Sequence, residues 1–486
     1  MPERIIMERY YLIVDIGTGN SRVALTTSTG KIIDMDSFEN VYQRDNLYDD
    51  AQFFSPSDWR KRIFEGCKKV IGAHKDIKIS GISASGARET IVCYDENGND
   101  FLGLPNIDNR GAKWMDEIPE KSYVYEKTGR WCTEDFPAAK LMGFRKMHKD
   151  EFAKIKKFTS LSEWVGEMFT GKIVIEPSMA CETQLFDIDD MKWSEKIAGF
   201  FKIPIETCPD VVCAGESIGK IAKKVADELG IDENAEFIIG GADTQLAAKA
   251  MNVKVGDICI CSGTTSPVVT ILDHKYYDDK ERCWTDLNLG GKTFQVETNP
   301  GVTGNNFQRF KKVFFPNTSY PEIDEILAKK TDYICTASFS SLNFTQRKSL
   351  KKGGFVMRAP FPQNMDLGDY ALAVLSDIAC SIYVQYNNLC EMIPNSNDYI
   401  LGCGGGFKQK YLCHAIADLT GRELRMYEGF DQATVLGCVK LCNEHFGIDN
   451  KESTSEPLVY KPNSNPDSLI ERYFREWRVN RNILNP

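Results

Sequence analysis

The feature that most constrains the fold is a strand–turn–strand pattern that occurs twice, near residues 11–25 and again near residues 257–269. In both copies an apolar run ends in a turn rich in glycine and hydroxyl residues, and a second apolar run follows. One such pattern is usually a plain β-hairpin. Two copies in two halves of the chain predict a duplicated domain whose turns hold one polyphosphate from both sides.

The residue types in the two turns suit phosphate binding. Glycine lets a backbone approach a ligand closely, and backbone N–H groups, hydroxyls and a guanidinium all donate hydrogen bonds to phosphate oxygens. Asp15 stands just before the first turn, where a carboxylate could hold Mg²⁺ through water. The candidate phosphate-binding residues are Gly17, Thr18, Asn20, Ser21, Arg22, Gly263 and Thr264.

Two further segments join an apolar strand to glycines and then to a helix-like run. Asp243 follows two glycines at the start of one such run, where an acid could be the base that activates an alcohol. The alternative is an ordinary helix N-cap, a position that favours Asp. Gly404, Gly405 and Gly406 follow the predicted strand 399–403, and a flat stretch of backbone there suits a purine ring or a phosphate. The alternative is a plain strand-to-helix turn.

The order of these motifs resembles the FGGY carbohydrate kinase family, which includes glycerol kinase, xylulokinase and autoinducer-2 kinase. The resemblance spans about residues 10–445 and is carried by Asp15-Ile-Gly-Thr-Gly-Asn-Ser-Arg22, Gly240-Gly-Ala-Asp-Thr-Gln245, Ser262-Gly-Thr-Thr265, Gly404-Gly-Gly406 and Gln432-Ala-Thr-Val-Leu-Gly437. It implies an α/β, two-domain, actin-like ATPase (ribonuclease H-like) fold with duplicated domains and an active site in the cleft between them.

The same resemblance implies the chemistry. The chain is expected to transfer the γ-phosphoryl group of ATP to a hydroxyl of a small sugar, ketose or polyol. Asp243 is the expected general base, Asp15 and Asp243 are the acids on the side of Mg²⁺, and Gly304 with Gly404–Gly406 is expected to border the nucleotide. Such a transfer depends on positioning and charge neutralisation more than on covalent chemistry.

Two segments resemble the substrate side of the family. Arg88-Glu89 is similar to the glycerol kinase pair that binds hydroxyls, since a guanidinium donates and a carboxylate accepts. The alternative is a surface ion pair. Asn106 and Asp108 are the other expected substrate residues, but Ile107 stands where many members have Trp. Lys408, after the glycines, departs from the family pattern and either reaches a phosphate or is solvated.

The length of 486 residues predicts two domains, 9–250 on the substrate side and 251–486 on the nucleotide side. Apolar spacing predicts helices near 57–73, 137–170, 411–420, 432–445 and 468–480, and a three-stranded meander over 10–35. The polar stretch 449–467 is expected to be a loop. The alternation of strands and helices predicts an α/β fold.

The composition predicts a cytoplasmic protein that binds neither nucleic acid nor a membrane. A net charge of −10 shows no basic surplus. No apolar run approaches the length of a bilayer span, and the N-terminus lacks the apolar core of a signal peptide. The sixteen cysteines are scattered, which predicts reduced, buried thiols, and the five histidines do not indicate a zinc site.

Other functions stay open at this point. They are an autoinducer-2 kinase acting on a small polyhydroxylated dione, a non-enzymatic nucleotide switch like actin, and a kinase-like regulator that binds sugar without catalysis. Arg88, Glu89 and Asp108 argue against the switch, and Asp243 argues against the regulator. The identity of the substrate, the hydroxyl that reacts and the choice between monomer and homodimer are left open.

Overall fold

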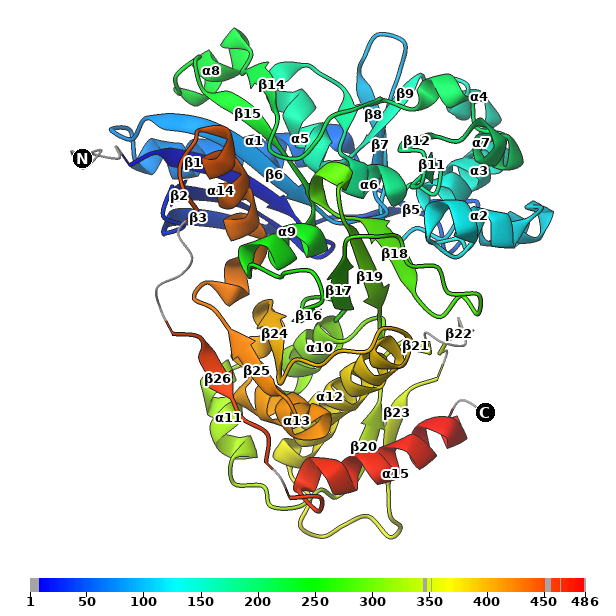
Figure 1. Cartoon of the computed structure of the whole chain (residues 1–486), viewed down its shortest axis with the longest axis vertical. Coiled ribbons are helices and arrows are strands. Elements are labelled where there is room, and N and C mark those ends of the chain that lie inside the picture. Colours follow the sequence, from blue (N-terminus) through cyan, green and yellow to red (C-terminus); the bar gives the residue numbers. More distant parts are fainter. Residues whose placement is uncertain (1–7, 344–347, 351, 451–455, 464, 485–486) are drawn as a thin grey trace.

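Two β-sheets, one from each half of the chain, organise the fold. The computed structural model describes residues 8–343, 348–350, 352–450, 456–463 and 465–484. In Figure 1 the first sheet lies in the upper part of the molecule and the second sheet in the lower part. The cores of the two halves are therefore separate, and a site between the sheets can draw residues from both.

The first sheet begins with the predicted meander. Its strands, in spatial order, are β14 (Ser217–Lys220), β15 (Glu236–Ala242), β6 (Ile79–Gly86), β1 (Tyr10–Ile16), β2 (Asn20–Thr27) and β3 (Ile32–Glu39). The neighbours β1, β2 and β3 are antiparallel, whereas β6 runs parallel to β1 and β15 runs parallel to β6. The third strand of the meander extends to residue 39, beyond the predicted end near 35.

The second sheet repeats this plan. Its strands, in spatial order, are β18 (Trp284–Leu287), β19 (Phe294–Thr298), β17 (Val268–Leu272), β16 (Ile258–Cys261), β24 (Tyr399–Cys403), β25 (Glu423–Met426) and β26 (Leu458–Tyr460). The set β19-β17-β16-β24-β25 has the same order and the same strand directions as β3-β2-β1-β6-β15. This repeat confirms the predicted duplicated α/β fold.

Helices cover the two sheets and supply most of the core. In α1 (Pro56–Ala73), Ser55 accepts a hydrogen bond from the backbone N–H of Asp58, and Trp59 and Ile63 are among the buried apolar residues that the sequence spacing predicts. The other helices on the first sheet are α5 (Leu161–Thr170) and α8 (Lys223–Leu229). Those of the second half are α10 (Gly304–Phe314), α11 (Tyr320–Leu327), α12 (Leu367–Met392), α13 (Lys410–Thr420) and α15 (Leu469–Leu484).

An additional lobe with its own apolar core is inserted between β6 and β14. The helical spacing near 137–170 is confirmed by two helices and by α5, and the prediction is wrong at β9 (Lys157–Ser160), which lies between them. The strand pairs with its neighbour in a three-stranded sheet, and this pairing overrides the helical spacing. The other elements of the lobe are β7 (Ile91–Tyr94), β8 (Asp100–Leu104), α2 (Lys121–Thr128), α3 (Pro137–Met147), α4 (Lys149–Phe152), α6 (Pro177–Cys181) and α7 (Glu195–Phe201).

Short paired strands complete the structure. They are β4 (Gln43–Arg44) with β5 (Gln52–Phe53), β10 (Val174–Ile175) with β13 (Asp210–Val211), β11 (Phe186–Asp187) with β12 (Lys192–Trp193), β20 (Cys335–Ser338) with β23 (Gly354–Met357), and β21 (Leu342–Asn343) with β22 (Lys348–Ser349).

Two helices, α9 (Asp243–Ala250) and α14 (Ala433–His445), pack against each other near the middle of the molecule (Figure 1). A Cβ at Gly437 would lie 2.2 Å from the carbonyl oxygen of Leu246, so only glycine allows this approach. Val435 and Cys438 pack into a cluster with residues of β1 and β15. A helix of the second half therefore covers the first sheet, and the domain division near residue 250 stays a prediction.

Two expectations about long segments need correction. The helix α12 is long and apolar enough, by length and composition, to cross a membrane, although the sequence analysis found no such run. Most of its apolar window is buried, and it forms the centre of the core beneath the second sheet. The expected loop 449–467 contains β26, which pairs with β25; residues 451–455 and 464 of that stretch lie outside the described residues. All sixteen cysteines are free thiols, and most are buried, as predicted.

Candidate active site

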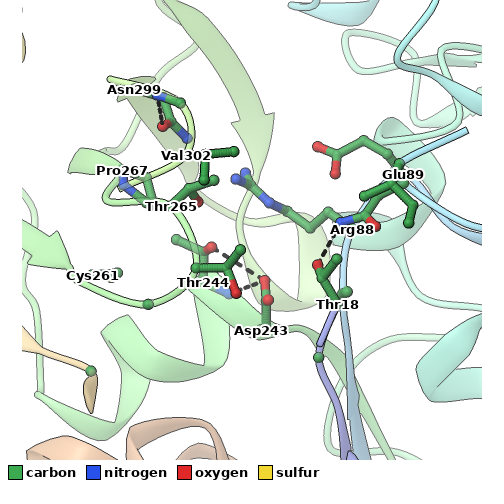
Figure 2. A pocket seen from close by; sticks show the side chains of 18 of the residues that line it. Thr18, Arg88, Glu89, Asp243, Thr244, Cys261, Thr265, Pro267, Asn299 and Val302 are labelled. Carbon is green, nitrogen blue, oxygen red and sulfur yellow. Dashed lines mark hydrogen bonds between the residues drawn. The ribbon is translucent and has the colours of Figure 1, made fainter. Parts of the chain in front are cut away.

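A cavity of about 700 Å³ lies between the two sheets and is lined by residues of both halves. Figure 2 shows Asp243, Arg88 and Glu89 on its wall together with Thr18 from the first turn and Thr265 from the second. The predicted site residues that line it are Asp15, Gly17, Thr18, Arg22, Arg88, Glu89, Asn106, Asp243, Gly263, Thr264, Gly404 and Gly405. The predicted residues outside this lining are Asn20, Ser21, Asp108, Gly304 and Gly406.

The first turn connects β1 to β2 and is held in shape by a side chain from outside it. The Nδ2 atom of Asn40 donates to the carbonyl oxygen of Gly17 at 2.7 Å, and its Oδ1 accepts from the hydroxyl of Ser21 at 2.7 Å. Ser21 is thus engaged inside the protein, and Asn20 is exposed. Thr18 points the other way: its hydroxyl accepts from Nδ2 of Asn106 at 2.8 Å and lies on the cavity wall.

Asp15 and Arg22 are paired across the β1–β2 hairpin, next to its turn. One carboxylate oxygen of Asp15 accepts from Nε of Arg22 at 2.9 Å and from the hydroxyl of Thr434 at 2.9 Å. Arg22 also donates through Nη1 to Oε1 of Gln432 at 2.6 Å. Gln432 and Thr434 belong to the last motif of the sequence, so that motif orients the charged pair of the first turn.

Asp243 is the first residue of α9, and the N-cap position belongs to Ala242. Its Oδ1 accepts from the backbone N–H of Thr244 at 2.7 Å and from the Thr244 hydroxyl at 3.2 Å. Burial raises the pKa of Asp243 to about 6, a shift that the Arg88 guanidinium opposes and the carboxylates of Asp15 and Glu89 increase. A carboxylate with that pKa is largely ionised at neutral pH and can still accept a proton.

The second turn, between β16 and β17, packs closely against the glycines that follow β24. A Cβ at Gly404, whose φ is +100°, would lie 2.4 Å from the carbonyl oxygen of Ser262, and one at Gly406 would lie 2.2 Å from the Ser262 hydroxyl. Gly304 approaches the carbonyl oxygen of Gly263 in the same way. These three glycines allow the second turn to lie close both to the residues after β24 and to the start of α10. A Cβ at Gly405 would have no atom within 4 Å, and this residue lines the cavity.

Arg88 follows β6 and is tied to carboxylates that the sequence analysis did not identify. Its two terminal nitrogens donate to both oxygens of Glu297 at 2.6 and 3.0 Å. Glu182 and Asp286 lie 3.5 and 3.6 Å from the same guanidinium. Only 7% of the residue is exposed, so the alternative of a surface ion pair is wrong.

A second buried arginine completes this charge cluster. Arg130 forms ion pairs with Glu182 and, at 2.6 Å, with Asp286. Burial raises the pKa of Asp286 to about 7 and that of Glu182 well above its usual range. Apart from Arg88, the cluster lies outside the cavity lining, and both of its guanidinium groups are paired with carboxylates. An acid within an apolar strand, such as Glu297 in β19, was the signal in the sequence that could have identified it.

Glu89 lies on the cavity wall in a left-handed backbone conformation, with a φ of +56°. Lys140, fully buried, donates to the Glu89 carbonyl oxygen at 2.6 Å and stabilises this backbone. Burial lowers the pKa of Lys140 to about 8. A strained non-glycine residue at a cavity wall is common at functional sites, because the surrounding structure has to hold it there.

Asn106 and Asp108 are separated by the fold although they are two residues apart. Asn106 lines the cavity, whereas Asp108 is buried outside it. The Asp108 carboxylate accepts from Nε of Arg110 at 2.7 Å and from the backbone N–H of Gln52 at 2.9 Å. These contacts hold the loop that follows β8 in place.

Two tryptophans outside the sequence motifs line the cavity. At the position where many family members have Trp, this chain has Ile107, which also lines the cavity. Trp131 and Trp284 also line it, with ring centroids 5.1 Å apart and nearly perpendicular. At the other end, Lys408 forms an ion pair with Asp431 at 2.8 Å, and only Asp431 of this pair lies on the cavity wall.

Comparison with known proteins agrees with this geometry. Residues 10–249 match the FGGY family of carbohydrate kinases, N-terminal domain. A protein described as putative sugar kinase YoaC, from Bacillus subtilis (strain 168), is 38% identical over 474 residues, which are 97% of this chain and 96% of that protein.

Solved structures show the same fold at low identity. A ligand-bound xylulose kinase from Lactobacillus acidophilus superposes with a TM-score of 0.82 at 18% identity, over 98% of both chains. A glycerol kinase from Plasmodium falciparum with ADP superposes with a TM-score of 0.82 at 16% identity, over 98% of both chains. The match to the Bacillus protein over nearly the full length of both chains, together with the family match, shows that the chain belongs to the FGGY family of carbohydrate kinases.

Proposed function

We propose that this carbohydrate kinase transfers the γ-phosphoryl group of ATP to a hydroxyl of a small, neutral sugar, ketose or polyol, with Asp243 as the general base. The observation that carries the proposal is the position of Asp243 on the wall of a cavity that both glycine turns line. A hydroxyl bound against this carboxylate can lose its proton as it attacks a phosphoryl group held by the turns.

At the nucleotide end of the cavity, the protein would contact ATP mainly through backbone groups and less through charged side chains. The glycine turn at Gly263-Thr264 and the glycines Gly404 and Gly405 would border the phosphates and the base of ATP. Two carboxylates on one wall, Asp15 and Asp243, provide the hard oxygen ligands that Mg²⁺ prefers, so this chain's residues fit the ion. Bound there, Mg²⁺ would neutralise phosphate oxygens during the transfer.

The charges near the substrate end favour a neutral substrate over a sugar acid. Arg88 is occupied by Glu297, and Arg130 is occupied by Glu182 and Asp286. Glu89 adds a further carboxylate on the wall. A sugar acid would therefore bring its carboxylate to the already paired guanidinium of Arg88 and close to the carboxylates of Glu89 and Asp243, whereas sugar hydroxyls can donate hydrogen bonds to these two carboxylates. The small dione of autoinducer-2 kinases is also neutral and stays an alternative.

The test of the general base is Asp243→Asn, compared with Asp227→Asn on the exposed face of α8. Loss of a general base typically lowers the rate by about 10²–10⁴. We expect the Asp243 variant to lose turnover by that factor in an assay coupled to ADP release and to keep its affinity for ADP in calorimetry. Turnover near that of the unmodified protein would disprove the assignment.

The test of the substrate class is a panel of neutral ketoses and polyols, the autoinducer dione and sugar acids, ranked by kcat/KM. We expect the best neutral compound to exceed every sugar acid by at least about tenfold, which corresponds to 1.4 kcal/mol. A sugar acid at the top of the ranking would contradict the charge argument and leave the kinase assignment intact.

Family membership argues for an enzyme over a nucleotide switch of the same fold. The cytoplasmic location, the absence of nucleic-acid and membrane partners, and the choice between monomer and homodimer stay predictions. The same assay panel separates an active kinase from a regulator that binds sugar, since only the kinase releases ADP.

A further inference from the structure

Three cysteines converge at the base of the second turn, on the nucleotide side of the cavity. Cys259 and Cys261 lie two residues apart on β16, so their side chains share one face of the strand. Cys403, the last residue of the neighbouring parallel strand β24, is paired with Cys261 in the sheet. We call Cys259, Cys261 and Cys403 the thiol cluster.

The sulfur positions in the thiol cluster suit a single cation. The Sγ atoms of Cys261 and Cys403 are 3.5 Å apart, and all three Sγ atoms lie within 4.8 Å of one another. Three thiolates bound tetrahedrally to Zn²⁺ at about 2.3 Å each would place their sulfur atoms about 3.8 Å apart. The cluster therefore needs only side-chain adjustments to close around a cation of this size.

The thiol cluster borders the cavity. Cys259 and Cys403 are fully buried, Cys261 is 9% exposed, and Cys261 and Cys403 both line the cavity. A buried cysteine is often only a small apolar residue, but three that present sulfur to one point at a cavity wall form a donor set.

We propose that Cys259, Cys261 and Cys403 form a binding site for a thiophilic d¹⁰ cation of the Zn²⁺ class, open to the nucleotide end of the cavity. Three protein ligands leave the fourth tetrahedral position toward the cavity, where water can complete the coordination. The site is distinct from the carboxylate pair Asp15 and Asp243, whose oxygen ligands suit Mg²⁺.

Occupancy changes the charge beside the proposed nucleotide site. Three neutral thiols and one Zn²⁺ give a tris-thiolate complex with a net charge of −1 and release three protons. The thiol cluster adjoins Ser262-Gly263 and Gly404, where the phosphates of ATP are proposed to bind. A new negative charge there repels the nucleotide. Binding of the cation and binding of ADP should therefore oppose each other, and this linkage, unlike the cation site, depends on the proposed function.

The test uses the reduced, metal-free full-length protein and Cd²⁺ as a spectroscopic probe. We expect thiolate-to-Cd²⁺ charge-transfer absorption that saturates at one Cd²⁺ per chain and is displaced by Zn²⁺. Cys259→Ser and Cys403→Ser should each lower the Cd²⁺ affinity by more than the roughly 10–100-fold cost of losing an outer-shell partner. The matched control is Cys67→Ser, a fully buried cysteine in α1, which should leave the absorption unchanged.

The proposal is overturned if the unmodified protein shows no thiolate-to-Cd²⁺ absorption, or if both cluster variants retain it. Circular dichroism of each variant identifies misfolding, and a blocking experiment on the unmodified protein does not depend on the variants. In it, Cd²⁺ should protect the partly exposed Cys261 from alkylation and Mg²⁺ should not, and equal labelling of Cys261 would contradict the site. For the linkage we expect about a tenfold weaker ADP affinity with Zn²⁺ bound. Unchanged ADP affinity would reject the linkage and leave the cation site standing.

Discussion

The two sheets share one strand plan but carry different chemistry at corresponding positions. Aligning the turns on Gly17-Thr18 and Gly263-Thr264 places Asp15 of the first sheet opposite Cys261 of the second. Asp15 is joined at the cavity by Arg22 and Asp243, whereas Cys261 is joined by Cys403 and the glycines. At these corresponding positions the first half thus supplies charge, and the second half supplies thiols and exposed backbone.

This difference shows how a duplicated scaffold can divide one reaction between its halves. Phosphoryl transfer needs a base and oxygen ligands for a cation on one side, and a close-fitting surface for the nucleotide on the other. The predictions that follow test whether the reaction depends on the charges of Asp15 and Asp243 and whether the second sheet acts through its backbone.

The largest contrast is expected between Asp15→Asn and its positional counterpart Cys261→Ser. Loss of a preorganised charge typically costs about 10²–10³ in kcat. Asp15→Asn should lose that much and require more Mg²⁺ for half-maximal rate, whereas Cys261→Ser should lose less than about tenfold, or 1.4 kcal/mol. Rates measured over a range of Mg²⁺ concentrations test this difference. Equal losses of rate in the two variants would mean that the charge at Asp15 is no more important than the thiol at Cys261.

The backbone role of the second sheet is tested by Gly404→Ala against Gly405→Ala. At Gly404 a Cβ meets the Ser262 carbonyl oxygen at 2.4 Å and φ is +100°, so we expect about 1–3 kcal/mol of destabilisation in chemical unfolding. Gly405 has open space and should keep its stability while losing affinity for ADP. If Gly404→Ala unfolds at the same denaturant concentration as the unmodified protein, a Cβ at this position does not clash with the Ser262 carbonyl oxygen.

The charge on the first sheet should also be visible in the pH profile. Burial raises the pKa of Asp243 to about 6, with Arg88 opposing the shift and Asp15 and Glu89 increasing it. The ionised carboxylate is the active base, so kcat/KM should be constant above that pH and fall about tenfold per pH unit below it. Arg88→Lys, which keeps the charge, should preserve the midpoint. A midpoint near pH 4, the ordinary value for Asp, would show that Asp243 is not desolvated in the free enzyme.

Much of the architecture could be predicted from local sequence. The two hairpins, the helix at 56–73 and the helices near 410–420 and 433–445 follow from apolar spacing and turn residues that act over a few positions. The part of the 137–170 prediction that fails, at β9, has the opposite cause. With only four residues, β9 is too short to show a strand pattern of its own, and it becomes a strand because it pairs with β7.

The sequence by itself determined which residues can bind phosphate, because glycines, hydroxyls and acids at fixed spacing keep their chemistry in any fold. Tertiary structure decided which of them face the cavity. Ser21 is held by Asn40, Asp108 by Arg110, and Gly406 by Ser262, so these residues are committed to internal contacts. The pairing of Arg88 with Glu297 and of Cys261 with Cys403 joins positions more than a hundred residues apart. The physical reason is that a side chain's partners depend on which strands and helices pack together, and that packing is not determined by the few residues around each position.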